Sequence, residues 1–148
     1  MLLELPFRLA MLDMDAAAKP MVANPGVTAW AVGGHSLGGV AAASFAGKND
    51  ATVQGLVLLA SYLSVDLSQS SVQVVSITAT EDKVLNWGSY NDTVTKLPTE
   101  AEYVSIEGGN HGQFGMYGQQ SGDGVAVIAS EAQQTQAMAA TRNLLKTL

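Results

Sequence analysis

The residues best suited to chemistry form a glycine-flanked serine motif, Gly33-Gly34-His35-Ser36-Leu37-Gly38-Gly39. Glycines two residues before and two residues after Ser36 allow the close backbone approach that a sharp turn needs. A serine at the apex of such a turn exposes its hydroxyl, which becomes a nucleophile when a base removes its proton. The motif therefore predicts a nucleophilic Ser36, with little room for a Cβ at Gly34 or Gly38.

Histidine is the usual base for a serine, and the sequence contains two histidines. His35 adjoins Ser36, and successive side chains on such a turn point apart, so we expect His35 to be a packed or hydrogen-bonded structural residue. His111 lies 75 positions after Ser36, in a glycine-rich loop that follows a predicted strand. The need of Ser36 for a base therefore favours His111.

An acid must hold the imidazole in one tautomer and stabilise its cation. Asp82 follows one predicted strand and precedes His111, which gives the chain order serine, acid, histidine. Asp82 ranks first because its strand is expected to lie beside the strand that leads to His111. Glu81 and Asp66 are the competing acids, and Asp92 is expected to be solvated. Asp82 also suits a helix N-cap, and one side chain can serve both purposes.

Apolar and polar segments alternate along the chain in a way that predicts how these residues are positioned. A short apolar segment at 2–5 is followed by predicted strands at 27–32, 53–60, 72–79 and 103–106. Helices are predicted at 8–22, 37–46, 83–96 and 125–147, a turn at 24–26, and loops at 61–71 and 107–124. This order predicts a minimal α/β fold with a mostly parallel, doubly wound sheet of about five strands.

Such a sheet brings the loops at the carboxyl ends of its strands to one rim, where ligands bind. Ser36, Asp82 and His111 all follow predicted strands, so we expect them to meet there. A helix beginning at Leu37 would present free backbone N–H groups and the positive end of its dipole beside the serine. The sequence therefore predicts that the Leu37 N–H stabilises a developing oxyanion.

Composition excludes several other classes of protein. The 148 residues suit a single domain over 1–148, and 47% of them are apolar while 14% are charged. A net charge of −6 with scattered basic residues argues against nucleic acid as a partner. No membrane-spanning run, signal peptide or cysteine is present, which predicts a cytoplasmic protein. No histidine–carboxylate cluster indicates a metal site, and no glycine-rich phosphate loop is present.

Three motifs together resemble an α/β-hydrolase of the dienelactone-hydrolase-like branch: Gly-His-Ser-Leu-Gly-Gly, Thr-Glu-Asp and Glu-Gly-Gly-Asn-His-Gly-Gln-Phe-Gly. The last motif is similar to the histidine loop of the small esterase-like members of that branch, and the resemblance runs from about residue 2 to the end. It implies Ser36 as nucleophile, Asp82 as acid and His111 as base. It also implies hydrolysis of carboxylic esters without a cofactor.

The chain departs from this family at its N-terminal end, and the departure leads to two expectations. The family normally has more sheet before the region that matches residues 2–6, including a strand whose following loop supplies a second oxyanion N–H. In this N-terminally shortened domain we expect that donor to come from the backbone near residues 6–8 or from another chain. Strand 27–32 would have an open edge unless residues 2–5 pair with it, which predicts a homo-oligomer.

The expected site is shallow, because no insertion between strands 53–60 and 72–79 is long enough for a lid. Five residues could line an acyl pocket, although each also suits an ordinary core: Trp87, Tyr90, Phe114, Met116 and Tyr117. The sequence favours a serine carboxylesterase acting on small, fairly apolar esters. Hydrolysis of lactones, dienelactones or thioesters is an open alternative, as is a catalytically impaired hydrolase fold that serves as a binding or assembly module.

Overall fold

The computed structural model describes residues 16–116 and 118–148. Four parallel strands form one sheet in the order β1-β2-β3-β4. Their bounds are β1 Trp30–His35, β2 Val53–Leu59, β3 Gln73–Ala79 and β4 Glu102–Ile106. The predicted parallel α/β fold is thereby confirmed, whereas the segment at 2–5 and most of the predicted helix at 8–22 lie outside the described residues.

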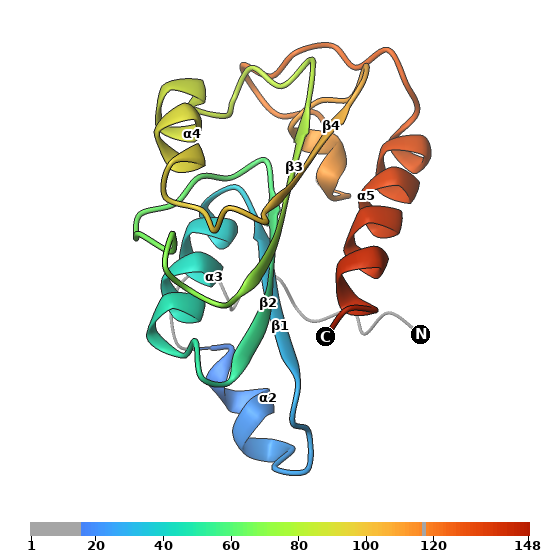
Figure 1. Ribbon diagram of the computed structural model, residues 1–148. Helices are drawn as coiled ribbons and strands as arrows, with labels where there is room; N and C mark the ends of the chain where they lie inside the picture. Colours follow the sequence, from blue (N-terminus) through green and yellow to red (C-terminus); the bar gives the residue numbers. More distant parts are fainter. Residues whose placement is uncertain (1–15, 117) are drawn as a thin grey trace.

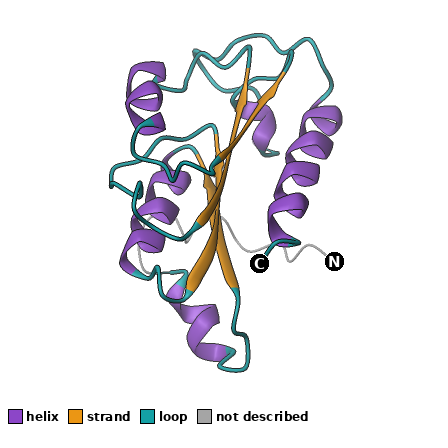
Figure 2. Cartoon of the chain, in the orientation of Figure 1, coloured by secondary structure: helices purple, strands orange, loops and turns teal. Residues whose placement is uncertain are grey.

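Helices cover both faces of the sheet (Figure 1). They are α2 Ala18–Ala23, α3 Leu37–Lys48, α4 Trp87–Val94 and α5 Ser130–Leu145, with a short 3₁₀ helix, η1, at Gly112–Phe114. Figure 2 shows α3 and α4 on one side of the strands and α5 with η1 on the other. The connection between β2 and β3 is the place where the sequence offered no insertion for a lid, and it contains no helix.

Two hydrophobic clusters hold these layers together, one on each face of the sheet. Side chains alternate along β2, so Leu56 and Leu58 pack with α3 while Val57 packs toward α5. Both sides of β2 and β3 are buried, which explains their nearly continuous apolar sequences. The turn at Ser36, at the end of β1, therefore leads into one cluster through α3. Helix α5 is part of the other cluster.

Several element boundaries differ from the sequence prediction, and two of the differences have clear local reasons. β1 begins at Trp30 rather than at 27, because the Val27 N–H is already used in a turn, donating to the Asn24 carbonyl at 3.0 Å. α5 begins at Ser130 rather than at 125. The Val127 N–H instead donates to the carbonyl of Gly108 at 2.8 Å, which ties the chain before α5 to the loop after β4.

The described ranges contain no helix that is both long enough and apolar enough to cross a membrane.

Candidate active site

Ser36 occupies a strained turn between β1 and α3. Its φ of 54° and ψ of −124° are rare for a residue with a side chain. The backbone on both sides holds this conformation: the Ser36 N–H donates to the Leu59 carbonyl at 2.9 Å, and the Ser36 carbonyl accepts from the Gly39 N–H at 2.9 Å. Leu37 begins α3, so its N–H points out of the first helical turn beside the serine. The structure thus has the sharp strand–turn–helix geometry that the sequence predicts.

The glycines of this turn match the expectation only in part. A Cβ at Gly34 would overlap the backbone of Gly38, which confirms the need for glycine at that position. The expectation for Gly38 is wrong, because a Cβ placed there would meet no described atom within 4 Å apart from its chain neighbours and the backbone of its own helix. Gly39 is the crowded position instead: a Cβ there would overlap the side chain of Ser61.

Ser61 reaches the turn from the loop after β2. Its hydroxyl donates a hydrogen bond to the Ser36 carbonyl at 2.7 Å, and the residue is 1% exposed. It follows Ala60, the other described non-glycine residue with a positive φ (46°). A second strained turn therefore holds the first one in place. The sequence does not reveal this residue, because Ser61 opens a serine-rich loop in which no single serine stands out.

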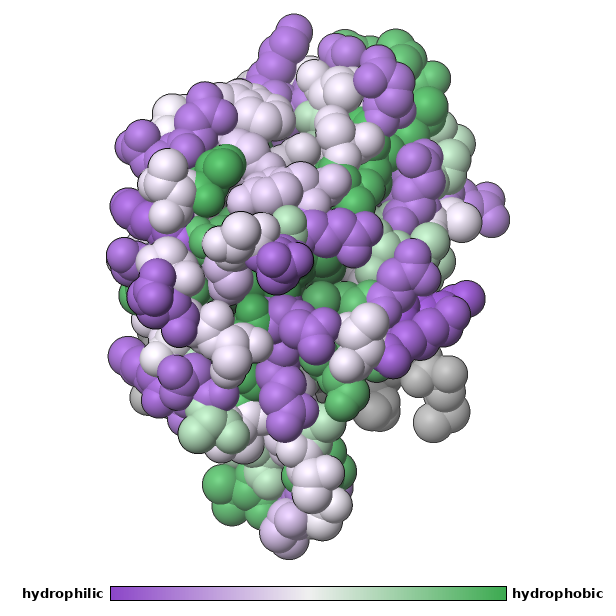
Figure 3. Space-filling view, viewed as in Figure 1, coloured by the Kyte–Doolittle hydropathy of each residue, from purple (hydrophilic) through white to green (hydrophobic). Residues whose placement is uncertain are grey.

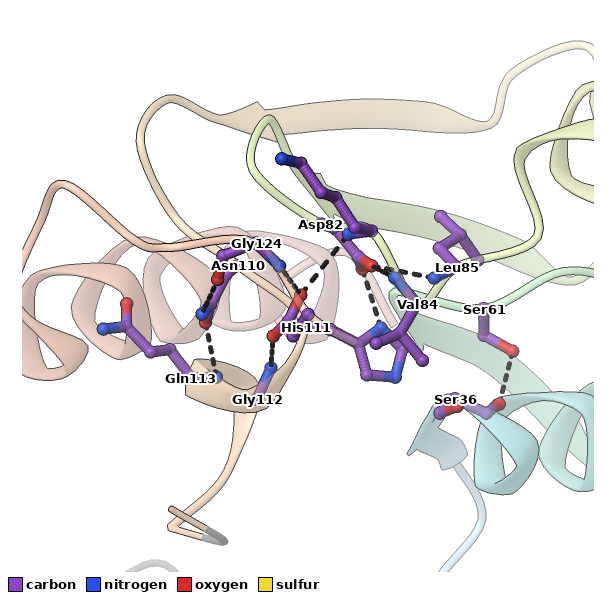
Figure 4. Close-up of polar contacts among 12 residues, drawn as sticks. Ser36, Ser61, Asp82, Val84, Leu85, Asn110, His111, Gly112, Gln113 and Gly124 are labelled. Carbon is purple, nitrogen blue, oxygen red and sulfur yellow. Dashed lines mark hydrogen bonds and ion pairs between the residues drawn. The ribbon is translucent and has the colours of Figure 1, made fainter. Parts of the chain in front are cut away.

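Asp82 and His111 lie together at the rim of the sheet, at the ends of β3 and β4. The Asp82 Oδ2 and the His111 Nδ1 are 2.7 Å apart, and both side chains are buried (Figure 4). Because an ionised carboxylate only accepts hydrogen bonds, Nδ1 is the donor. In the neutral form of the ring, Nε2 then carries the lone pair. The structure therefore brings together the acid and the base that were predicted from sequence.

The Asp82 carboxylate is stabilised as an anion by several donors. Its Oδ1 accepts from the backbone N–H groups of Val84 at 2.9 Å and Leu85 at 2.8 Å. Burial alone would raise the pKa of Asp82, but the hydrogen bonds from His111, Leu85 and Val84 and the charge of His111 together hold it below its ordinary value. Asp82 thus organises its own turn and also holds His111. The expectation that Asp82 is a helix N-cap is wrong, because the N-cap of α4 is Asn86.

The second ring nitrogen of His111 is available for proton transfer. Its Nε2 is buried and has no hydrogen-bond partner among the described residues. Figure 4 shows this edge of the ring facing the side on which Ser36 lies. The structure gives no hydrogen bond between Ser36 Oγ and Nε2, and in ligand-free enzymes this contact commonly tightens only when substrate binds. A ring nitrogen without a described partner therefore faces the side of Ser36, the predicted nucleophile.

His35 packs against the base. The rings of His35 and His111 are 4.4 Å apart between centroids and tilted by 48°, and the Phe114 ring lies 5.8 Å from His35 on another side. Burial, followed by the charge of His111, lowers the pKa of His35 from 6.5 to about 4. His35 is consequently neutral near neutral pH and supports His111 by packing.

The other acids considered from the sequence have no described hydrogen bond to His111. Of the described acidic residues, Asp82 is the one that is hydrogen-bonded to His111. The backbone N–H of Glu81 donates to the Gly109 carbonyl at 2.8 Å. Asp66 is exposed and accepts from the Ser68 N–H at 2.9 Å, and Asp92 is exposed on α4.

The residues suggested for an acyl pocket are spread around the site. Trp87 is 38% exposed and donates through its indole N–H to the Asp82 carbonyl at 3.0 Å. Tyr90 and Phe114 are each 9% exposed, and the Tyr90 hydroxyl lies 3.3 Å from that of Ser76 in the interior. Met116 is 94% exposed. Tyr117 lies outside the described residues.

A cavity of about 650 Å³ borders the histidine loop and includes Met116, Gln113 and Val125 in its lining. Neither Ser36 nor His111 lines it, so the cavity lies beside the predicted catalytic residues rather than around them. Val125 is 76% exposed, and Figure 3 shows hydrophobic surface at the upper right, over the segment that joins η1 to α5. The surroundings of the site are thus open and partly apolar.

Two polar residues that the sequence analysis did not single out hold the histidine loop: the fully buried Gln133 and the half-buried Asp123. Gln133 of α5 is 0% exposed and brackets Asn110: its Oε1 accepts from the Asn110 N–H at 3.0 Å, and its Nε2 donates to the Asn110 carbonyl at 2.8 Å. Asp123 accepts from the Gly112 N–H at 2.8 Å. A glutamine on a predicted helix and an aspartate in a glycine-rich loop are common on protein surfaces, so sequence offered no reason to select them.

In the part of the chain that the structure describes, no three or more histidine or acidic side chains come together as metal ligands.

Residues 1–135 match the model of the alpha/beta hydrolase family. The chain therefore belongs to the alpha/beta hydrolase family, the class that the parallel sheet and the serine turn define. This membership supports a hydrolase activity. No curated protein gives a match to the sequence.

Solved structures share the fold at low sequence identity. A CIB-like hydrolase from Thermoplasma acidophilum aligns with a TM-score of 0.65 and 13% identity, over 93% of this chain and 60% of that one. A structure from a study of carboxylesterases of the ammonia-oxidizing thaumarchaeon Nitrososphaera gargenis aligns with a TM-score of 0.54 and 12% identity, over 68% of this chain and 64% of that one. The chain thus spans less than two thirds of the length of either structure.

Proposed function

We propose that the protein is a serine carboxylesterase that acts on small, fairly apolar carboxylic esters. The observation that carries the proposal is the strained Ser36 turn at the same rim as a buried His111–Asp82 pair whose outer nitrogen has no partner among the described residues. A serine, a histidine and a carboxylate in these relations supply both the nucleophile and the proton transfers of ester hydrolysis. The open, partly apolar surroundings favour small, uncharged acyl groups.

Acylation begins when the Ser36 Oγ bonds to the ester carbonyl carbon and the His111 Nε2 takes the hydroxyl proton. The carbonyl oxygen becomes an oxyanion, which the Leu37 N–H and the positive end of α3 stabilise. Collapse of this intermediate breaks the ester C–O bond, and His111 returns the proton to the departing alcohol. The product is an acyl group on Ser36.

Deacylation repeats the same steps with water as nucleophile. The His111 Nε2 takes a proton from water, whose oxygen bonds to the acyl carbon, and then returns the proton to Ser36 as the acid product leaves. In both halves the imidazolium forms beside the Asp82 carboxylate. Because the pKa of that carboxylate is held low, it is ionised and stabilises the cation.

The test is labelling by a fluorophosphonate probe together with hydrolysis of p-nitrophenyl acetate and butyrate. Ser36→Ala should abolish labelling and lower kcat by at least about 10⁴-fold, because the covalent step is lost. Ser44→Ala, further along α3, is the matched control and should keep both properties. Equal hydrolysis by the wild type and by Ser36→Ala would exclude this assignment.

The same experiment separates the alternatives. A panel of lactones and thioesters identifies the preferred acyl donor among substrates that one triad can hydrolyse. A hydrolase fold that serves only for binding or assembly would give a folded wild-type protein that the probe does not label, since the probe reacts only with an activated serine.

A further inference from the structure

We propose that Asp123 is a positioning residue that holds the acid loop and the base loop at a fixed separation; this inference rests on the proposed function. Asp123 belongs to neither loop. It lies in the segment that crosses the rim from η1 to α5, drawn in orange at the top of Figure 1. This segment brings a third chain section against the two loops that carry Asp82 and His111.

The Asp123 carboxylate contacts the residue that directly follows each of these two side chains. Its Oδ2 accepts from the Gly112 N–H at 2.8 Å, immediately after His111. Its Oδ1 accepts from the Lys83 N–H at 3.3 Å, immediately after Asp82, and from the Gly124 N–H at 2.8 Å. One side chain therefore bridges the backbones of the acid and the base.

The neighbouring Gly124 makes the same connection through its backbone. A Cβ on Gly124 would overlap the Glu81 carbonyl, so the segment lies directly on the acid turn. The carbonyl of Gly124 accepts from the Asn110 side chain at 2.8 Å, and Gln133 holds the Asn110 backbone from α5. Residues immediately before and after both Asp82 and His111 are thereby fixed.

A carboxylate suits this position because all three of its partners are backbone N–H donors. Hydrogen bonds to an ionised acceptor are roughly twice as strong as neutral ones. An asparagine would keep one acceptor oxygen but would place an NH₂ group against another N–H. The 2.7 Å bond between Asp82 and His111 depends on the separation of their loops, and a displacement of about 1 Å in a catalytic group can cost about 10²-fold in rate.

The first experiment compares Asp123→Asn with Asp66→Asn. Asp66 is a matched control, because it is also a loop carboxylate that accepts a backbone N–H but is exposed and remote from His111. We expect Asp123→Asn to lower kcat for p-nitrophenyl butyrate by about 10- to 100-fold with KM unchanged. Asp66→Asn should behave as the wild type. Equal kcat values for the two variants would overturn the proposal.

The second experiment does not depend on activity. The proton between His111 Nδ1 and Asp82 should give a downfield NMR signal in the Ser36→Ala background, which retains the pair. Adding Asp123→Asn should broaden or shift this signal, whereas adding Asp66→Asn should leave it in place. An unchanged signal with Asp123→Asn would overturn the positioning role even if Ser36 proved not to be a nucleophile.

A third measurement uses the wild type alone and so remains decisive if Asp123→Asn does not fold. The Gly112 N–H opens η1, where it has no partner within that short helix, but it donates to Asp123, so its exchange with solvent should be slow. The exposed Met116 N–H, further along the same loop, is the comparison. Exchange of Gly112 as fast as that of Met116 would overturn the proposal.

Discussion

The two histidine rings at the site lie 4.4 Å apart between centroids but have different surroundings. His111 faces a carboxylate, whereas His35 is half-buried and packs against His111 and Phe114. Burial and the charge of His111 lower the pKa of His35 to about 4, and the negative charges of Asp82 and Asp123 oppose this shift without cancelling it. A neutral His35 allows His111 to take up a proton during catalysis without a second cation beside it.

This depressed pKa predicts a stability that depends on pH. Between 6.5 and about 4 the unfolded chain binds a proton at His35 while the folded protein does not, so stability falls as the pH falls through this window. The contribution is fully present above 6.5 and is lost as the pH approaches the folded pKa of about 4. The loss is at most about 1.4 kcal/mol per pH unit.

Urea unfolding of the wild type and of His35→Gln across this pH range measures the effect. The His35→Gln variant lacks the titrating ring, so its free energy of unfolding should decline less steeply. Parallel declines for the two proteins would show that other groups cause the acid sensitivity.

At the scale of elements, the serine turn depends on a neighbouring strand. β1 supplies the turn and α3 continues it, but the loop after β2 holds it through the hydrogen bond from Ser61 to the Ser36 carbonyl. That carbonyl also accepts from the Gly39 and Val40 N–H groups at the start of α3. The direction of the Leu37 N–H is therefore fixed jointly by three elements of structure.

Ser61→Ala should lower kcat by about 2- to 10-fold, because removing one hydrogen bond worth roughly 1 kcal/mol loosens the turn without unfolding it. KM should change little, since Ser61 is buried beneath the turn. Ser76→Ala is the control, because Ser76 is a buried serine that contacts Tyr90 instead. If both variants lose activity in proportion to their stability, Ser61 has no specific connection with the turn.

The elements that carry the site were predictable from sequence because each has a strong local pattern. The apolar runs predict β2 and β3, and the glycines around Ser36 predict the turn. The His111–Asp82 pairing follows from chain order and from the shared rim of a parallel sheet.

The contacts that the sequence did not predict depend on the paths that the loops take in space. Gly38 and Gly39 look equivalent in the chain, yet the side chain of Ser61 and the carbonyl of Gly34 crowd Gly39 and not Gly38. Asp123 and Gln133 acquire their importance from hydrogen bonds to loops that are distant in sequence. No local pattern encodes such contacts.

At the scale of the whole molecule, β1 is the outermost described strand on its side of the sheet. It pairs with β2, and the structure describes no strand on its other side. Unpaired N–H and C=O groups on an edge strand favour pairing with another chain. Residues 2–5, which could pair with β1 instead, lie outside the described residues, so a homo-oligomer stays a prediction. Light scattering over a range of micromolar concentrations measures its mass, and a monomer throughout would contradict the prediction.

The two halves of the site are anchored in different parts of the molecule. The Ser36 turn leads into α3, which packs in the hydrophobic cluster on one face of the sheet. The histidine loop is held by Gln133 of α5, and α5 packs in the cluster on the opposite face. Local opening of α5 would release His111 while the sheet and the Ser36 turn kept their shape. The proposed esterase would then pass through a nearly folded but inactive form, so its activity would report on the docking of one helix before any spectroscopic sign of unfolding.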